Sequence, residues 1–244
     1  MRLASRAMIV LHQFGPAWGI SNLSPFCFKI ENYLRLAGLP FEIEVSDPRK
    51  APLRKLPFIE DGGKVVADSA LIVDYLEKTY GARLDGKLDA AQRAQSRLVQ
   101  RMVEEAYYFC LLYSRWVDDA AFALLEKDQL KPMMPPIVRS IVPAIVRGQI
   151  MKALAAQGTG RHEASVVYEM GKADLTALSQ MLGDRRFVVA DEPTVVDASL
   201  YGSLAVTLWA PPESPLQAHM KTLPNLVAYC ERMKQRVDGS KPAT

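Results

Sequence analysis

The chain has 244 residues, of which 49% are hydrophobic and 23% are charged, a balance that is typical of a folded globular protein. Its net charge is only +3, from 30 basic and 27 acidic residues, and it has no basic face interleaved with aromatic residues, so we exclude a nucleic-acid partner. The cysteines Cys27, Cys110 and Cys230 offer neither a disulfide framework nor a zinc-type pair. Because the sequence also shows no signal peptide and no membrane-spanning run, we expect a cytoplasmic protein.

Residues 8–11 form an apolar run that continues through residues 12–14 and predicts a buried strand, and a loop with two glycines and a proline follows it. Ser24-Pro25 predicts the start of a helix, because Ser is a preferred N-cap and Pro is favoured at the first helical position. Residues 41–45 alternate apolar and acidic side chains, as a strand with one buried face does. The basic segment 47–55 is interrupted by proline and predicts a loop.

Residues 56–69 predict a hairpin that leads into a second helix. Two short apolar runs, 56–59 and 65–67, flank an Asp-Gly-Gly turn that suits positive φ angles. The helix begins at Asp68-Ser69 and has apolar residues at helical spacing. The predicted order over this first part is therefore β-α-β-loop-β-β-α, a βαβ unit followed by a hairpin, with helices packed on the sheet.

Two features of this hairpin indicate a ligand. Pro57 cannot donate to a strand ladder, so it belongs at a strand start, where a cis bond would leave the Leu56 backbone free to pair with a peptide-like molecule. Ser69 stands where a helix N-terminus can hold a carboxylate. The alternative is a plain hairpin that feeds a helix, with Ser69 as an ordinary cap.

From about residue 85 the pattern is helical to the end, which predicts two domains, residues 1–84 and residues 85–244. Residues 91–126 predict one long helix that has an apolar stripe and a cluster of aromatic side chains, closed by Pro132. Such a cluster is usually part of a core.

Residues 129–162 contain no acidic side chain, and their basic and apolar residues predict an amphipathic helix that is bent or split at Pro143. This helix either packs with a solvated basic face or lies on an anionic membrane surface. Further on, Thr194-Val195-Val196-Asp197 predicts a capping box. In that motif the Thr194 hydroxyl accepts from the third helical amide and Asp197 reaches back to the cap amide.

The order of elements resembles the glutathione transferases, which have an α/β thioredoxin-like N-terminal domain followed by an all-α C-terminal domain. Leu56-Pro57 matches the cis-proline position of that family, and Asp68-Ser69 matches its acidic-or-amide residue followed by Ser. Residues 24–31, the long first loop and the missing helix before the proline look closer to one branch, the metaxin-like and failed-axon-connections-like proteins, which has bacterial members. Residues 187–198 resemble the buried capping motif of the C-terminal domain, whose role is in folding.

The resemblance implies a site for glutathione, a tripeptide thiol with two carboxylates and an amine, as co-substrate. The Leu56 backbone beside Pro57 would pair with the tripeptide, and Ser69 would hold the γ-glutamyl carboxylate. Asp68 would meet the γ-glutamyl amine, and Lys55 or the arginine before it would bind the glycyl carboxylate.

Ser24 is the candidate for stabilising the glutathione thiolate. A free thiol has a pKa near 8.5, and lowering it by two units requires ~2.7 kcal/mol of preferential thiolate stabilisation. A hydroxyl donor at a helix N-terminus can supply much of this, although Ser24 is equally consistent with an N-cap that has no other role. Cys27, in the first turn, is a second candidate with a lowered pKa, but without a Cys at position 24 it has no dithiol partner, and a buried helical Cys is more often a packing residue.

In glutathione transferases the long helix faces the cleft for an apolar co-substrate, so Trp18, Tyr107, Tyr108 and Trp116 are expected to bind a small apolar electrophile. We therefore predict an enzyme that conjugates the glutathione thiolate to such an electrophile and that forms, by resemblance, a homodimer. The alternatives are a non-catalytic metaxin-like adaptor or membrane-surface protein with peripheral membrane contact, and a Cys27-dependent thiol oxidoreductase. No metal site is expected, because the histidines are far apart in the sequence.

Overall fold

The computed structural model describes residues 8–81 and 83–239. The chain divides into two compact units. The first unit consists of three separate segments, which are the chain up to residue 100, residues 184–206 and the chain from residue 228 onward; the second consists of residues 101–183 and 207–227. The boundary near residue 85, which separates the sheet-bearing part of the sequence from the helical part, stays a prediction.

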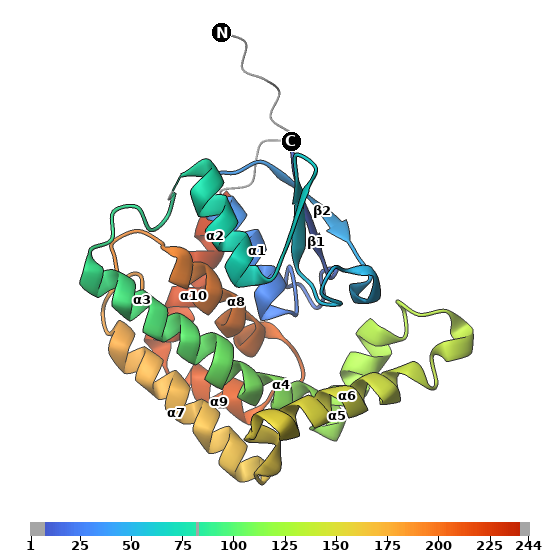
Figure 1. Ribbon diagram of the computed structural model, residues 1–244. Coiled ribbons are helices and arrows are strands. Elements are labelled where there is room, and N and C mark those ends of the chain that lie inside the picture. Colours follow the sequence, from blue (N-terminus) through green and yellow to red (C-terminus); the bar gives the residue numbers. More distant parts are fainter. Residues whose placement is uncertain (1–7, 82, 240–244) are drawn as a thin grey trace. The chain divides into compact units, whose positions relative to one another are not determined.

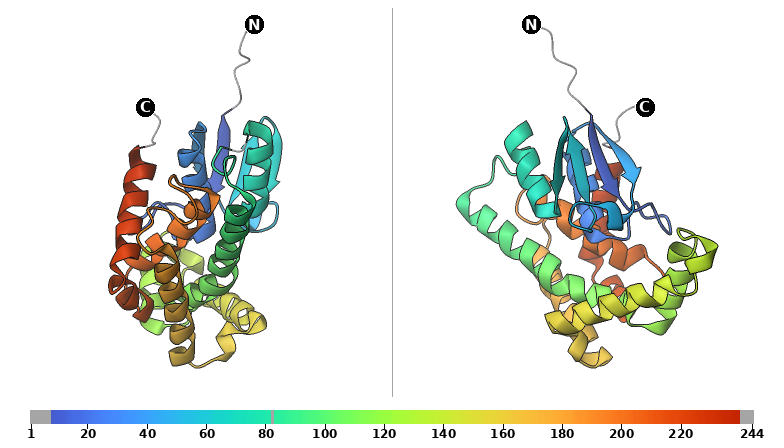
Figure 2. Two further views of the ribbon diagram at one scale, coloured as in Figure 1. Left: turned by 90° about the vertical axis from the view of Figure 1, so that its left-hand side faces the viewer. Right: turned by 45° about the vertical axis from the view of Figure 1, so that its right-hand side comes forward.

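The first unit contains a four-stranded sheet with the strand order β2-β1-β3-β4, seen in the right-hand view of Figure 2. β1 (Ile9–Gln13) pairs in parallel with β2 (Phe41–Val45). β3 (Phe58–Asp61) pairs antiparallel with β1 on one side and with β4 (Lys64–Ala67) on the other. The predicted βαβ unit and hairpin are therefore confirmed, and with them the thioredoxin-like fold class.

Two helices, α1 (Pro25–Leu36) and α2 (Ser69–Tyr80), lie on the same side of the sheet (Figure 1). Leu11 of β1 and Ile59 of β3 are opposite one another in the ladder and are both fully buried in the apolar cluster beneath these helices. Between β2 and β3 the described chain forms no helix beyond the single 3₁₀ turn Pro48–Lys50, as its composition predicted.

The first unit also contains the part of α8 (Val195–Trp209) up to residue 206, which packs directly on the first turn of α1. A Cβ atom on Gly202 would lie 2.9 Å from the Pro25 carbonyl oxygen, so this close approach requires glycine. Nearby, the Asn32 side-chain amide donates to the Ala198 carbonyl oxygen at 3.3 Å. These contacts bring residues that are far apart in the sequence into one packed layer.

Asp197, in the first turn of α8, is buried and joins two segments of the first unit, residues 184–206 and the chain from residue 228 onward. Its Oδ2 accepts from the Thr194 amide at 2.8 Å and from the Thr194 hydroxyl at 2.7 Å. Its Oδ1 accepts from the Val188 amide and from the hydroxyl of Tyr229 in α10 (Pro224–Gly239), both at 3.0 Å. The predicted reach of Asp197 back to the cap amide is confirmed, whereas the Thr194 hydroxyl donates to the carboxylate instead of accepting from an amide.

The second unit is helical over its described residues. The helix α3 (Ala90–Met102) leads into it. Its further elements, in chain order, are a π-helical turn Val103–Tyr107, α4 (Tyr108–Trp116), α5 (Asp119–Leu125), a second π-helical turn Glu126–Leu130, the 3₁₀ turn Pro136–Val138, α6 (Val142–Gln157), the 3₁₀ turn Thr159–Arg161, α7 (Ala164–Leu182) and α9 (Pro215–Lys221). The all-α character expected after the sheet is therefore confirmed.

Two helix boundaries differ from the sequence predictions. The long helix expected over 91–126 is interrupted after Trp116, because Asp118 has extended backbone angles and caps α5 by accepting from the Ala121 amide at 2.9 Å. Pro143 does not bend a helix but lies in the first turn of α6. A proline is well tolerated there, since the first-turn amides of a helix have no intrahelical acceptor.

We expect Asp197→Asn to destabilise the fold by about 2–3 kcal/mol, because an amide offers one acceptor oxygen where the carboxylate now serves four donors. The midpoint of urea unfolding, followed by circular dichroism, measures the loss. Asp191→Asn is the matched control, since Asp191 is an exposed carboxylate in the same segment. Equal midpoints for the two variants would contradict the role assigned to Asp197.

Candidate functional site

Ser24 is the N-cap of α1, as predicted, and its hydroxyl is half-buried. Its Oγ accepts from the Cys27 amide at 3.4 Å. The cap is held in place by Asn22, which accepts from the Ser24 amide at 2.9 Å and donates to the Phe14 carbonyl oxygen at 2.6 Å. A hydroxyl that accepts at Oγ still has one proton to donate, and the Cys27 thiol is one group within its reach.

Cys27 is fully buried and packs in a cluster with Ala51, Leu56 and Phe58. Burial raises the pKa of its thiol to about 12, against the smaller lowering effect of hydrogen bonds from Ser24 and from the Phe14 backbone. The sequence-based prediction of a lowered pKa for Cys27 is therefore wrong. A helix N-terminus lowers a thiol pKa only where the thiolate is not desolvated by its surroundings.

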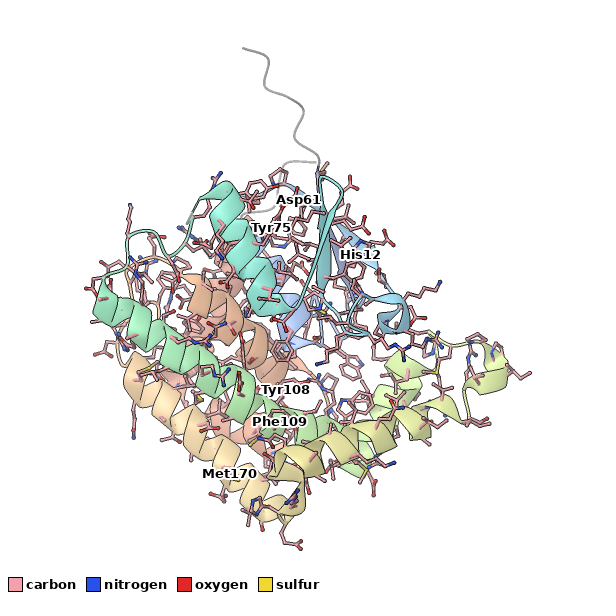
Figure 3. The ribbon with its side chains drawn as sticks, in the orientation of Figure 1. His12, Asp61, Tyr75, Tyr108, Phe109 and Met170 are labelled. Atoms are coloured by element: carbon pink, nitrogen blue, oxygen red, sulfur yellow. The ribbon has the colours of Figure 1, made fainter. Side chains whose placement is uncertain are left out.

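The peptide bond between Leu56 and Pro57 is cis, as predicted. Leu56 is buried, and it precedes the first ladder pair of β3, which is Phe58 with Ala67. Phe58 is fixed by His12, whose imidazole stacks on its ring with the centroids 4.0 Å apart. His12, labelled on the sheet in Figure 3, is also the ladder partner of Phe58 between β1 and β3.

Asp68 and Ser69 form the start of α2. Asp68 is exposed, has a φ of +78°, and caps the helix by accepting from the Ala70 amide at 2.9 Å. Ser69 is the first helical residue and is buried, and its Oγ lies 3.5 Å from the ammonium nitrogen of Lys29. The carboxyl-terminal end of β4 thus delivers both residues to the N-terminus of α2, where the helix amides carry partial positive charge.

Lys29 is the residue of this region that the sequence analysis missed. It is fully buried in α1 between Phe28 and Ile30, although lysine is almost never fully buried without a partner. The signal in the sequence is a cation inside an otherwise apolar helical stretch. If the helix is taken as amphipathic with one face in water, this cation is expected on the solvent face. The structure shows α1 buried on both sides, so the same position faces α2.

Lys55 is exposed in the loop before β3, and the arginine that precedes it has a φ of +51°. The role suggested for Lys55 therefore stays a prediction. Trp18 is half-buried at the tip of a tight turn in which Ala17 and Ile20 exchange two backbone hydrogen bonds of 3.0 and 2.9 Å. Positive φ angles at Trp18 and Gly19 are those of a type I′ turn, in which glycine suits the second position.

The remaining aromatic candidates belong to the second unit. Tyr107 is fully buried, and its hydroxyl forms a 2.6 Å hydrogen bond with the Thr207 Oγ1 atom, so it is a core residue and not a co-substrate contact. Tyr108, labelled in Figure 3, is half-buried and meets Phe109 edge to face. Trp116 is half-buried against Phe122, with ring centroids 5.9 Å apart. Tyr108 and Trp116 stay predicted contacts.

Two classes of site receive no support from the described part of the chain. Among residues 8–81 and 83–239, no group of three or more His, Cys, Asp or Glu side chains is arranged to hold a metal ion. Across the same residues, no helix has both the length and the apolar character needed to cross a membrane.

Two family models match the sequence. The model described as Glutathione S-transferase N-terminal domain matches residues 25–121, and the model described as Glutathione S-transferase, C-terminal domain matches residues 171–233.

Three similar proteins illustrate the range of relatives. The isoprene-epoxide–glutathione S-transferase of Rhodococcus sp. (strain AD45) is 35% identical over 242 residues, covering 95% of this chain and 100% of that protein. Failed axon connections of Drosophila melanogaster is 32% identical over 241 residues, but the alignment spans only 58% of its length against 94% of this chain. Metaxin-1 of Mus musculus is 30% identical over 224 residues, covering 87% of this chain and 70% of that protein.

Solved structures agree on the fold. The beta-etherase LigF from Sphingobium sp. strain SYK-6 superposes with a TM-score of 0.66 at 18% identity, over 96% of this chain and 98% of that one. A glutathione S-transferase from Methylobacterium radiotolerans, in complex with glutathione sulfonate, gives a TM-score of 0.60 at 21% identity, over 98% of this chain and 96% of that one.

We expect all three thiols of the native protein to resist alkylation. At pH 8 a thiol with a pKa of about 12, as in Cys27 and Cys110, is ionised in only about one molecule in ten thousand, and burial also raises the pKa of Cys230. Mass spectrometry after a short iodoacetamide treatment measures this. In denaturant all three cysteines should react, and a single rapidly labelled cysteine in the native protein would contradict the prediction.

Proposed function

Because the chain belongs to the glutathione S-transferase superfamily, in the branch that includes failed axon connections and the metaxins, we propose that it binds glutathione and conjugates it to a small apolar electrophile. Glutathione is the co-substrate of the family. The Rhodococcus relative is named as an enzyme that acts with glutathione on an epoxide, whereas the names failed axon connections and metaxin describe no reaction.

One observation carries the proposal: the first turn of α1, the Leu56–Pro57 bond and the start of α2 are neighbours in the first unit. Cys27, Leu56 and Phe58 share one apolar cluster, against which Ala67, the residue before Asp68, also packs. A peptide-like ligand on the Leu56 backbone would therefore have the Ser24 hydroxyl and the N-terminus of α2 within reach. This is the combination that a tripeptide with a thiol and a carboxylate requires.

Each polar group has a proposed task that its geometry supports. Ser69 and the first amides of α2 would bind the γ-glutamyl carboxylate, since a helix N-terminus offers amide donors and a favourable dipole. Asp68 is exposed, and its Oδ1 accepts from the Ala70 amide, so the carboxylate stands at the site entrance where the γ-glutamyl amine would lie. Lys55 remains the candidate for the glycyl carboxylate.

Ser24 would act on the sulfur. Its hydroxyl accepts from the Cys27 amide and still has one proton to donate, and the glutathione thiolate would accept that hydrogen bond in place of the buried Cys27 thiol. A thiolate stabilised in this way attacks the electrophilic carbon, and the carbon–sulfur bond forms while a carbon–oxygen or carbon–halogen bond breaks. A halide departs with the electron pair, whereas an epoxide oxygen keeps the pair, stays on the neighbouring carbon and takes a proton from water. The buried thiol of Cys27 cannot take this role, which also argues against the thiol oxidoreductase alternative.

The assignment of Trp18, Tyr108 and Trp116 as electrophile contacts stays a prediction; each side chain is half-buried and presents an aromatic surface. A homodimer and a cytoplasmic location stay predictions. An apolar electrophile is favoured by the chemistry of these side chains.

We expect isothermal titration with glutathione at up to millimolar concentration to give saturable heat, and a small epoxide to be conjugated. In Ser24→Ala, glutathione should still bind, while kcat at pH 7 falls by about 10- to 100-fold and the rising limb of its pH profile moves to higher pH, because the thiolate loses its hydrogen-bond donor. Absence of heat with the wild-type protein would reject the proposed function.

The loss of a helix cap needs its own control, because an N-cap Ser→Ala change alone costs about 0.5–2 kcal/mol of stability. Ser214 provides it: it caps α9, is followed by a proline as Ser24 is, and accepts from the Gln217 amide at 3.2 Å. Ser214→Ala should lower the melting temperature without moving the pH profile. If the pH profile moves equally in both variants, Ser24 does not stabilise the glutathione thiolate.

A second candidate function, an adaptor that docks on a membrane surface, is favoured by the segment 129–162. Met133, Ile137, Ile141 and Ile145 follow one another at four-residue intervals and are between 53% and 85% exposed, and no acidic residue lies in the segment. However, Arg147 is not available to a lipid, because it donates to the Trp116 and Val117 carbonyl oxygens and to Asp119.

If this segment docks on membranes, the protein should co-sediment with phosphatidylcholine vesicles containing phosphatidylserine and less with phosphatidylcholine alone. Ile137→Asp should reduce the bound fraction by at least about fivefold, since it places an acidic side chain at the most exposed of these apolar positions. Leu98→Asp is the control, because Leu98 is 72% exposed but lies in α3, outside the segment. Binding that ignores the anionic lipid would reject this candidate.

A further inference from the structure

The contact between Lys29 and Ser69 joins the two helices that frame the proposed glutathione site. Lys29 is fully buried in α1, and its ammonium nitrogen lies 3.5 Å from the Ser69 Oγ atom at the start of α2. The Lys29 backbone amide lies close to α8, since a Cβ on Gly202 would come within 3.3 Å of it. The lysine is therefore held on one side by the α8 contact and reaches across to α2 on the other.

The direction of this hydrogen bond is fixed by chemistry. An ammonium group has three donors and no acceptor, so the Ser69 oxygen must be the acceptor. The Ser69 hydroxyl consequently has its own proton available for donation, and it stands at the N-terminus of α2, where the first-turn amides carry partial positive charge. A carboxylate accepts hydrogen bonds only, so this arrangement offers it a matching set of donors.

The charge of Lys29 also favours a carboxylate at the start of α2. A carboxylate bound to the Ser69 hydroxyl would lie within about 6 Å of the Lys29 ammonium, given a normal hydrogen-bond length. Away from bulk water an opposite charge at that distance is attracted strongly, whereas an exposed lysine would be screened. The dipole of α2 also places partial positive charge at this end of the helix, so it adds to the attraction of the Lys29 ammonium for a carboxylate.

We propose that Lys29 is a positioning residue for the γ-glutamyl carboxylate of glutathione: it holds the Ser69 hydroxyl as a donor and places a buried positive charge behind it. This inference rests on the proposed function. With Lys29 in this role, the site should bind a ligand that has a γ-glutamyl carboxylate more tightly than a ligand that has only the peptide and the thiol.

The test compares two ligands by isothermal titration: glutathione, and the analogue 4-aminobutyryl-cysteinyl-glycine, which lacks the γ-glutamyl α-carboxylate. The wild-type protein should bind glutathione at least tenfold more tightly than the analogue. In Lys29→Met, which removes the charge at similar side-chain volume, the Kd of glutathione should rise at least tenfold while that of the analogue stays within about twofold. A purely structural role would weaken both ligands equally.

Lys78→Met is the matched control, because Lys78 is an exposed lysine on α2 and its removal causes the same change of net charge. It should keep the wild-type preference for glutathione. Should Lys29→Met not fold, Lys29→Gln takes its place, and the same loss of preference is expected because glutamine is uncharged. Adding Ser69→Ala to either Lys29 variant should cost less than Ser69→Ala costs in the wild type, since the two residues act together.

The outcomes separate the inference from the proposed function. If the wild-type protein binds neither ligand, the proposed function is wrong and this inference falls with it. If the wild-type protein prefers glutathione and the Lys29 variants keep that preference, the inference alone is overturned. Collapse of the preference in the Lys29 variants but not in Lys78→Met supports it.

Discussion

The burial of α1 on all sides is the constraint on which the first unit depends. A helix at the surface can leave its polar side chains in water, but a helix between a sheet and another helix has to satisfy each of them inside the protein. Lys29 reaches Ser69, Asn32 donates to the Ala198 carbonyl oxygen, and Glu31 accepts from Gln13 at 2.8 Å. These contacts join α1 to α2, to α8 and to β1, respectively. The helix that has Ser24 as its N-cap therefore also connects the other elements of the unit.

Much of the fold could be predicted from local sequence signals. Ser24-Pro25 marks a helix start because both residues suit that position for separate physical reasons, and the structure begins α1 there. The two glycines between β3 and β4 both have positive φ angles, as the predicted turn requires. The Asp68-Ser69 start of α2 and the cis bond before Pro57 were also within reach of the sequence. These signals are short-range, so no knowledge of tertiary packing was needed.

The misses share one cause, which is that burial depends on distant segments. Cys27 looked like a thiol at a helix N-terminus, but the chain folds Ala51 and Leu56 over it and raises its pKa to about 12. Tyr107 looked like one aromatic among several, until Thr207, a hundred positions away, proved to be its hydrogen-bond partner. Lys29 was not singled out, because nothing near it in the sequence indicates that α8 packs on this part of α1. Residue type and spacing therefore located the proposed site better than they assigned roles within it.

The glycine contact between α8 and α1 has a consequence for biosynthesis. Asn32 and Ala198 are 166 positions apart, and a ribosome that adds about 5–20 residues per second needs on the order of ten to thirty seconds to cover that distance. Throughout that interval the nascent α1 has its sheet and α2 beside it but no α8, so one flank of the helix stays uncovered. The packing around the helix that begins at Ser24 is thus completed late in translation, when the second half of the polypeptide has been made.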